Sequence, residues 1–130
     1  MRIGRLARDS GCSVETIRYY ERVGLLPAVK RSINGYREYT THHQKCLGLI
    51  LNCRNLGFSQ DQVRRMTELA VDEVPECRQV REVVIKHLAE VRQKQDELGK
   101  MEAALNRLAR KCDRDGTLKE CPVIDELMAE

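Results

Sequence analysis

A heptad stripe that begins at Cys77 and ends at Cys112 limits what this chain can fold into. Between the two cysteines, the stripe advances by alternating steps of three and four residues through Val80, Val84, His87, Val91, Lys94, Leu98, Met101, Leu105 and Leu108. This spacing puts all of them on one side of a long helix, while polar residues fill most of the other positions. Such a helix is marginal alone in water, so we expect it to pair with a second copy in a homodimer.

The cysteines at the two ends of the stripe cannot meet within one chain. They lie 35 residues apart, and a helix that rises about 1.5 Å per residue would separate them by roughly 50 Å. Antiparallel pairing would place Cys77 of one chain beside Cys112 of the other, whereas parallel pairing would leave them far apart. The heptad pattern is compatible with both directions, and the cysteines favour the antiparallel one.

A third cysteine, Cys121, follows Cys112 across a short polar loop and stands directly before Pro122. Proline suits the first position of a helix, so we expect Cys121 to cap a terminal helix that ends near Met128. The free N–H groups and the dipole at a helix start favour the thiolate, which is the form that binds metal. Two alternatives stay open: a redox switch between Cys112 and Cys121, and cysteines that are structural or hold a permanent zinc ion.

Three thiolates would form a soft, anionic site between two subunits, with Cys112 and Cys121 from one chain and Cys77 from its partner. Such donors select Hg(II), Pb(II), Cd(II) or Zn(II) over Mg(II) and Ca(II), at about one ion per subunit. Zinc favours a fourth ligand, which makes it the weaker candidate. The remaining cysteines lack partners at ligand spacing, and we expect them to be small core residues: Cys12, Cys46 and Cys53.

Basic residues are concentrated at the front of the chain. Residues 1–56 hold ten lysines and arginines against four acids, whereas residues 57–130 hold thirteen against sixteen. A basic N-terminal module indicates nucleic acid as a partner, with an ordinary solvated surface as the alternative. No apolar run approaches the roughly 18 residues of a membrane span, and the first residues lack a secretory signal. We therefore expect a cytoplasmic protein that does not bind membranes.

Two short helices joined by a tight turn are expected within this basic module. The first, with Ile3 and Leu6 on its apolar side, should end near Gly11, and Ser13 should cap a second that runs from Val14 to Arg22. This is a helix-turn-helix pattern, whose second helix is free to enter a major groove.

The next segment predicts a β-hairpin that would serve as a wing. Asn34-Gly35 between extended residues is the strongest short-range hairpin signal. The flanking residues include cations and amphipathic rings suited to phosphates and sugar edges: Arg31, Tyr36, Arg37 and Tyr39.

Two further helices complete the module. Thr40 or Thr41 should cap a third helix that ends near Asn55, and Ser59 with Gln62 forms a capping box for a fourth. The chain is thus expected to be mainly α, with a winged helix-turn-helix domain over residues 1–70 and a linker at 71–76. A dimerisation helix at 77–111 and a metal-binding loop with a short helix at 112–130 would follow.

The chain resembles the MerR family of transcriptional regulators over nearly its whole length. The matching segments are Ile3-Gly4, Val14-Glu15-Thr16-Ile17-Arg18-Tyr19-Tyr20-Glu21, Gly24-Leu25-Leu26-Pro27, Asn34-Gly35-Tyr36-Arg37-Glu38-Tyr39, Leu56-Gly57-Phe58-Ser59 and the three metal cysteines. Within the family, the cysteines resemble those of the divalent heavy-metal branch, of cadmium/lead or mercury type. Zinc sensors of the family carry additional ligands where this chain has Asp113.

The resemblance implies a regulator of heavy-metal resistance genes, not an enzyme. Its expected DNA contacts are Arg18 and Tyr19, supported by Thr16 and Tyr20, with Tyr36, Arg37 and Tyr39 as wing contacts. The family's mechanism implies a dimer on a dyad operator in a promoter whose spacer is too long. Metal binding then makes the dimer bend and untwist the DNA, which realigns the promoter elements for RNA polymerase. The different-class alternative is a thiol redox sensor on the same scaffold.

Overall fold

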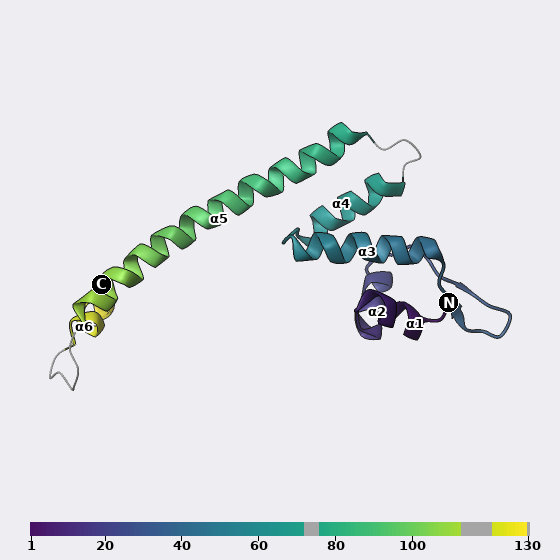
Figure 1. Cartoon of the computed structure of the whole chain (residues 1–130), viewed down its shortest axis with the longest axis horizontal. Coiled ribbons are helices and arrows are strands. Elements are labelled where there is room, and N and C mark those ends of the chain that lie inside the picture. The colour runs from purple at the N-terminus through teal and green to yellow at the C-terminus, as the bar shows by residue number, and fades with distance from the viewer. Residues whose placement is uncertain (72–75, 113–120, 130) are drawn as a thin grey trace. The chain divides into compact units, whose positions relative to one another are not determined.

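The computed structural model describes residues 1–71, 76–112 and 121–129. Within these ranges the chain is mainly helical, as predicted, with six helices and one short hairpin (Figure 1). The chain divides into two compact units, Met1–Ile85 and Lys86–Glu130. None of the described helices is long and apolar enough to cross a membrane.

Helices α1 (Ile3–Ser10) and α2 (Val14–Arg22) form the predicted helix-turn-helix. Gly11 ends α1 with a φ of 70°, the left-handed conformation that glycine adopts at little cost. Ser13 starts α2, because its Oγ accepts a hydrogen bond from the Thr16 N–H at 3.1 Å. Local residue chemistry therefore sets both sides of the turn.

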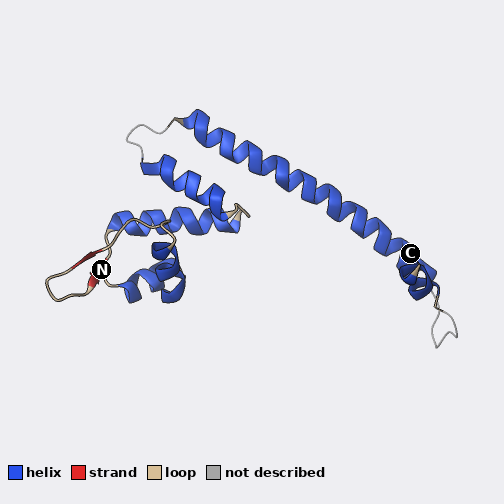
Figure 2. Cartoon of the chain, turned by 180° about the vertical axis from the view of Figure 1, so that it is seen from behind, coloured by secondary structure: helices blue, strands red, loops and turns tan. Residues whose placement is uncertain are grey.

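Strands β1 (Lys30–Arg31) and β2 (Arg37–Glu38) form the predicted hairpin, with Arg31 opposite Arg37 (Figure 2). The turn lies at its tip, where Gly35 has a φ of 81° and its N–H donates to the Ser32 carbonyl at 2.9 Å. Both strands are short, and their residues are exposed. The hairpin must therefore be held in place by contacts beyond its own two strands.

Helices α3 (Thr41–Asn55) and α4 (Gln60–Val71) begin at capping boxes. At α3 the Thr40 hydroxyl accepts from the His43 N–H, and His43 Nδ1 accepts from the Thr40 N–H at 3.1 Å. At α4 the Ser59 N–H donates to Gln62 Oε1 at 2.8 Å, and the Gln62 N–H donates to Ser59 Oγ at 3.2 Å. The second of these boxes is the one that the sequence predicted.

The core of the first unit forms where α3 contacts α1 on one side and α4 on the other (Figure 1). Its buried members are Leu6, Ile17, Tyr20, Leu25, Leu26, Tyr39, Leu47, Ile50, Cys53, Phe58 and Val63. Val83, from the first turns of α5 (Cys77–Lys111), packs against this core. This contact explains why the first compact unit extends past residue 70, where we expected the DNA-binding domain to end.

Helix α5 begins at Cys77 and ends at Lys111, which are the bounds expected from the heptad stripe. The stripe is open to solvent along the second half of α5, where Leu98, Met101 and Leu105 are each more than half exposed. Helix α6 (Pro122–Met128) follows, with Cys121 at its N-cap as predicted. Residues 72–75 of the expected linker and 113–120 of the expected metal loop lie outside the described residues.

Candidate functional site

The recognition helix α2 presents its polar side to solvent and its apolar side to the core. Arg18 and Tyr19 are exposed, as expected of residues that face DNA, while Ile17 and Tyr20 are buried. Thr16 stands at the first turn, where its Oγ1 lies 2.7 Å from Ser13 Oγ. Thr16 thus contacts the residue that caps α2, and Tyr20 packs in the core beneath the helix.

Tyr19 is held by two neighbours that the sequence did not associate with it. Its hydroxyl donates to Gln60 Oε1 of α4 at 3.0 Å. The Arg22 guanidinium lies over its ring, 5.5 Å from the centroid, which is within the range of a cation–π contact. The exposed ring of Tyr19 therefore has a defined orientation on the surface of α2.

Arginines from α2, the hairpin and the N-terminus meet around two adjoining hollows. The first, of about 280 Å³, is lined by Arg2, Ile3, Arg18, Arg31, Gly35, Tyr36 and Arg37. The second, of about 440 Å³, is lined by Arg18, Glu21, Arg22 and Arg37. Guanidinium groups gathered in this way suit phosphate oxygens, which accept their hydrogen bonds in pairs.

Two of these arginines, Arg2 and Arg22, were not predicted as DNA contacts from the sequence. Arg22 follows Arg18 by four residues on α2, so helical spacing alone could have placed both on one side. Helical spacing could not have predicted Arg2. It joins this surface through Tyr36, a residue distant in the sequence, whose ring centroid lies 4.0 Å from the Arg2 guanidinium.

The three expected wing residues occupy different environments. Tyr36 and Arg37 are exposed, whereas Tyr39 is only 1% exposed. The Tyr39 hydroxyl donates to Glu21 Oε1 of α2, and burial together with this bond raises the pKa of Tyr39 to about 12. The side chain of Tyr39 thus belongs to the core beneath the wing, while Tyr36 and Arg37 form its open surface.

At the other end of the chain, α6 is held on the last turns of α5 by one carboxylate. Glu126 accepts from Lys111 Nζ at 2.8 Å and lies 3.4 Å from Arg107 Nη2. The hydrogen bond from Lys111 is the main cause that lowers the pKa of Glu126. These contacts bring Cys121, at the start of α6, back to Cys112 at the end of α5.

The two thiols line the same hollow. The backbone N–H groups of Ile124 and Val123 lower the pKa of Cys121, and a hydrogen bond with the Cys112 thiol lowers it further. A thiol of lowered pKa forms the metal-binding thiolate more readily. Beside the pair is an apolar hollow of about 430 Å³, lined by Leu105, Leu108, Ala109, Cys112, Cys121, Val123, Ile124 and Leu127.

The other cysteines do not join this pair. Cys77 is exposed at the opposite end of α5. Cys53 is buried in the core, and Cys12 and Cys46 pack partly buried against it, which confirms that these three are small core residues. Among the described residues of a single chain, no three potential ligands gather around one point.

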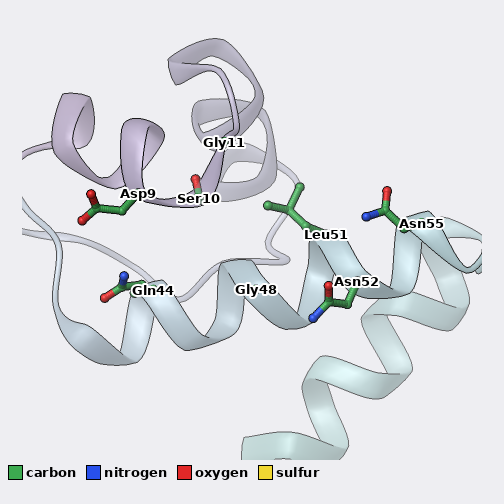
Figure 3. A pocket seen from close by; sticks show the side chains of 8 residues that line it. All are labelled: Asp9, Ser10, Gly11, Gln44, Gly48, Leu51, Asn52 and Asn55. Carbon is green, nitrogen blue, oxygen red and sulfur yellow. The ribbon is translucent and has the colours of Figure 1, made fainter.

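A further hollow, of about 440 Å³, lies between α1 and α3 (Figure 3). Five of its eight lining residues have polar side chains, and the full lining consists of Asp9, Ser10, Gly11, Gln44, Gly48, Leu51, Asn52 and Asn55. None of these residues is a cation or carries sulfur. The hollow is therefore suited neither to DNA phosphates nor to a soft metal ion.

The fold and these two sites define a class: a winged helix-turn-helix DNA-binding protein with a paired-thiol site at the far end of a long helix. Residues 1–69 match the family model described as MerR HTH family regulatory protein, and residues 45–108 match the model described as MerR, DNA binding. The chain belongs to the MerR family of regulators.

Similar proteins agree with this assignment. The HTH-type transcriptional regulator ZntR homolog of Haemophilus influenzae is 38% identical over 111 residues, which cover 85% of this chain and 82% of the relative. The crystal structure of PbrR691 from Ralstonia metallidurans CH34 in complex with lead(II) has a TM-score of 0.86 at 37% identity and covers 98% of both chains.

The regulator MerR from Bacillus megaterium MB1, solved in complex with mercury(II), has a TM-score of 0.77 at 30% identity, with coverage of 99% of this chain and 100% of that one. The present chain is accordingly a metal-responsive transcription regulator and not an enzyme. Because these two relatives were solved with different metals, they do not single out one ion for this chain.

Proposed function

We propose that this regulator senses a soft divalent ion at a three-cysteine site shared by two subunits, and thereby controls heavy-metal resistance genes. Cys112 and Cys121 of one chain would bind the ion together with Cys77 of the partner. The observation that carries the proposal is that Cys112 and Cys121 line the same hollow, where the backbone N–H groups of Ile124 and Val123 lower the pKa of Cys121. Two adjacent thiols, one of them readily ionised, are suited to be the first two ligands of such an ion.

The third ligand requires a second copy of the chain. The exposed apolar residues of α5 support a coiled coil, because a stripe of leucines and methionine open to water gains free energy when it pairs. In an antiparallel pair, Cys77 at the start of α5 would approach the thiols at the end of the partner's α5. Each dimer would then hold two equivalent sites.

The donor set favours mercury, lead or cadmium. Three sulfur ligands satisfy Hg(II) and Pb(II), whereas zinc favours four ligands, so zinc is the weaker candidate. The complexes of similar proteins with lead(II) and mercury(II) are in keeping with this preference.

On the DNA side, the arginine-lined hollows would bind the backbone of a dyad promoter operator. Arg18 and Tyr19 would lie in the major groove, and Tyr36 and Arg37 would contact the flanking backbone. Metal binding would shift the bound dimer so that it bends and untwists the spacer for RNA polymerase. Such a deformation costs a few kcal/mol, which the protein–DNA contacts offset.

Metal titration of the reduced protein tests the shared site. A sulfur-to-metal charge-transfer band should saturate at about one ion per subunit and weaken strongly in Cys77→Ser. Cys46→Ser, which replaces a cysteine outside the site, should leave the band unchanged. If Cys77→Ser binds the ion as the wild type does, the shared site is wrong.

Mixed dimers give a more demanding test. A dimer of one Cys77→Ser chain and one Cys112→Ser chain should retain one intact site, because one end of the dimer then contains all three cysteines. Homodimers of either variant should have no intact site. A mixed dimer that binds no metal ion would refute the antiparallel arrangement.

The wing assignment has its own test. Arg37→Ala should weaken operator binding about tenfold, the usual size of a lost phosphate contact, and leave metal affinity nearly unchanged. The opposite result, weaker metal binding with normal DNA binding, would refute the assignment.

The contact between Cys112 and Cys121 also favours one alternative, a thiol redox sensor on the same scaffold. A redox sensor would change its transcription output when these two thiols form a disulfide without metal. A metal sensor would respond to the ion under fully reducing conditions. In vitro transcription with reduced protein, with and without metal, separates the two.

A further inference from the structure

Glu21 is the carboxylate at which the wing meets the recognition helix. Arg37 Nη1 of β2 donates to Glu21 Oε2 at 2.9 Å, and the Tyr39 hydroxyl donates to Glu21 Oε1. Each carboxylate oxygen therefore accepts one bond from the segment that follows the hairpin tip. The Glu21 side chain is 14% exposed and that of Arg37 is 43% exposed, so this ion pair is partly shielded from water.

The wing depends on contacts of this kind. Its strands are two residues each and lie exposed, and an isolated hairpin of that size is not stable in water. Other ties lead to the N-terminal residues: the Tyr39 N–H donates to the Met1 carbonyl, and Arg2 lies over the Tyr36 ring. Among the described residues, Glu21 alone joins the hairpin to α2 by hydrogen bonds.

The charge of Glu21 opposes the function of the surface around it. Glu21 lines the same hollow as Arg18, Arg22 and Arg37, which are the cations suited to DNA phosphates. A carboxylate at this place repels phosphate and, taken alone, reduces DNA affinity. A neutral residue would serve electrostatics better, so the position of Glu21 calls for another explanation.

We infer that Glu21 is a positioning residue for DNA binding: by holding Arg37 and Tyr39, it fixes the wing at a set orientation to the recognition helix. This inference rests on the proposed function of the arginine-lined surface. With the wing fixed, α2 and the hairpin contact the same stretch of DNA backbone together. Without the bond the wing still carries all its cations, but they no longer reach their phosphates in register.

The test is Glu21→Gln, with Glu15→Gln as a matched control. Both variants remove one negative charge from α2, and no side-chain bond of Glu15 is found among the described residues. The DNA is a duplex selected by the wild-type protein from random-sequence DNA, with an unselected duplex for comparison. Binding is measured over a series of salt concentrations.

Glu21→Gln should weaken binding to the selected duplex about tenfold, the size expected for a lost charged hydrogen bond. The slope of log K against log salt reports how many phosphates the protein neutralises. In Glu21→Gln this slope should decrease by the amount expected for about one phosphate contact, although no cation has been removed. Glu15→Gln should keep the wild-type slope and bind equally well or more tightly.

A double variant shows whether Glu21 acts through the wing. If it does, Glu21→Gln should cause a smaller further loss in the Arg37→Ala background than in the wild type, because only the bond from Tyr39 then remains to be lost. Additive losses would overturn the inference. Tyr39→Phe keeps the ion pair and removes one hydrogen bond, so it should show a smaller loss than Glu21→Gln.

Three results distinguish the inference from its alternatives. If Glu21→Gln tightens binding to both duplexes as Glu15→Gln does, Glu21 acts only as a charge and the inference is wrong. A lower melting temperature with an unchanged salt slope would mean general destabilisation, which also overturns it. If Arg18→Ala leaves DNA binding intact, the proposed DNA surface itself is wrong.

Discussion

The head (residues 1–71) and the second compact unit (Lys86–Glu130) differ in how far their apolar residues are buried. The head buries Leu6, Ile17, Leu47, Ile50 and Val63 completely within one chain. In the second unit, the apolar residues of the stripe and of α6 remain exposed: Leu98, Met101, Leu105, Ile124, Leu127 and Met128. The head has a core of its own, whereas the second unit has an apolar surface that one chain does not cover.

This difference separates the two activities of the regulator. The arginine-lined hollows are assembled by one chain, since α2, the hairpin and the N-terminus all belong to the first unit. Within the described part of one chain, two cysteines of the proposed metal site, Cys112 and Cys121, line one hollow, while Cys77 lies at the opposite end of α5. Under the proposed function, reading DNA would be a property of the folded head, while responding to metal would require the dimer.

The largest effect should come from a charge placed in the exposed stripe. Leu98→Glu would bury a carboxylate between two helices, which costs several kcal/mol, so the dimer dissociation constant should rise more than about a hundredfold. Sedimentation equilibrium measures this change. Asn106→Asp adds the same charge on the exposed side of α5 away from the stripe and should stay dimeric. A dimeric Leu98→Glu would show that the stripe is not the interface.

The next largest effect should come from truncating a core side chain in the head. Leu47 is fully buried, so Leu47→Ala should lower the free energy of unfolding of the head by about 3 kcal/mol. The chain has no tryptophan and four tyrosines, all in the head, so tyrosine fluorescence during urea unfolding reports on the head alone. The exposed Ile33→Ala should have little effect. Equal losses from both variants would contradict the assigned core.

A third prediction compares thiols from the two regions. The pKa of Cys121 is lowered by helix N–H groups, while burial raises the pKa of Cys46. In the metal-free, reduced protein, the alkylation rate of Cys121 should therefore reach half its maximum at a pH below 9.0. That of Cys46 should reach half its maximum above pH 9.0. Peptide mass spectrometry across a pH series measures both in one sample.

The directions of these two pKa shifts also determine how each thiol changes the stability of the fold with pH. The lowered pKa of Cys121 stabilises the fold above pH 9.0, and this contribution is lost as pH falls through the lowered value. The raised pKa of Cys46 acts in the opposite direction, so its contribution is present below pH 9.0 and is lost at higher pH. If Cys46 ionises before Cys121, the described environments of both thiols are wrong.

The smallest effect should come from the ion pairs that hold α6. Glu126→Gln removes the contacts with Lys111 and Arg107, which are exposed and therefore weak, so metal affinity should fall by about twofold to fivefold. High salt should reduce the difference from the wild type. The control is Asp96→Asn, which breaks an exposed pair with Lys100 within α5 and should leave metal affinity unchanged. An equal loss in both variants would mean that α6 is not held by Glu126.

Much of the local structure could be predicted because it depends on neighbours in the sequence. Ser13, Gly11, and Ser59 with Gln62 act within one turn of their own positions, and each helix boundary that they predicted is present. The Asn34-Gly35 turn and the bounds of α5 followed in the same way from short-range or periodic patterns.

The details of the sites depended on contacts between distant residues, which no local pattern reveals. Tyr36 and Tyr39 lie three residues apart and look equivalent in the sequence, yet one ring is exposed beside Arg2 and the other is buried against Glu21. The bond between Tyr19 and Gln60 likewise joins two helices whose packing had to be known first.

By itself, the sequence determined the helices, their caps, the hairpin and the heptad stripe, because these arise from interactions within a few residues of the chain. It also determined the donor chemistry, since the cysteines and arginines are present whatever the fold. Only the tertiary structure decided that Tyr19 bonds to Gln60 and that Glu21 joins the wing to the recognition helix. Both contacts require separate elements to pack together, and packing is a property of the whole unit rather than of any one segment.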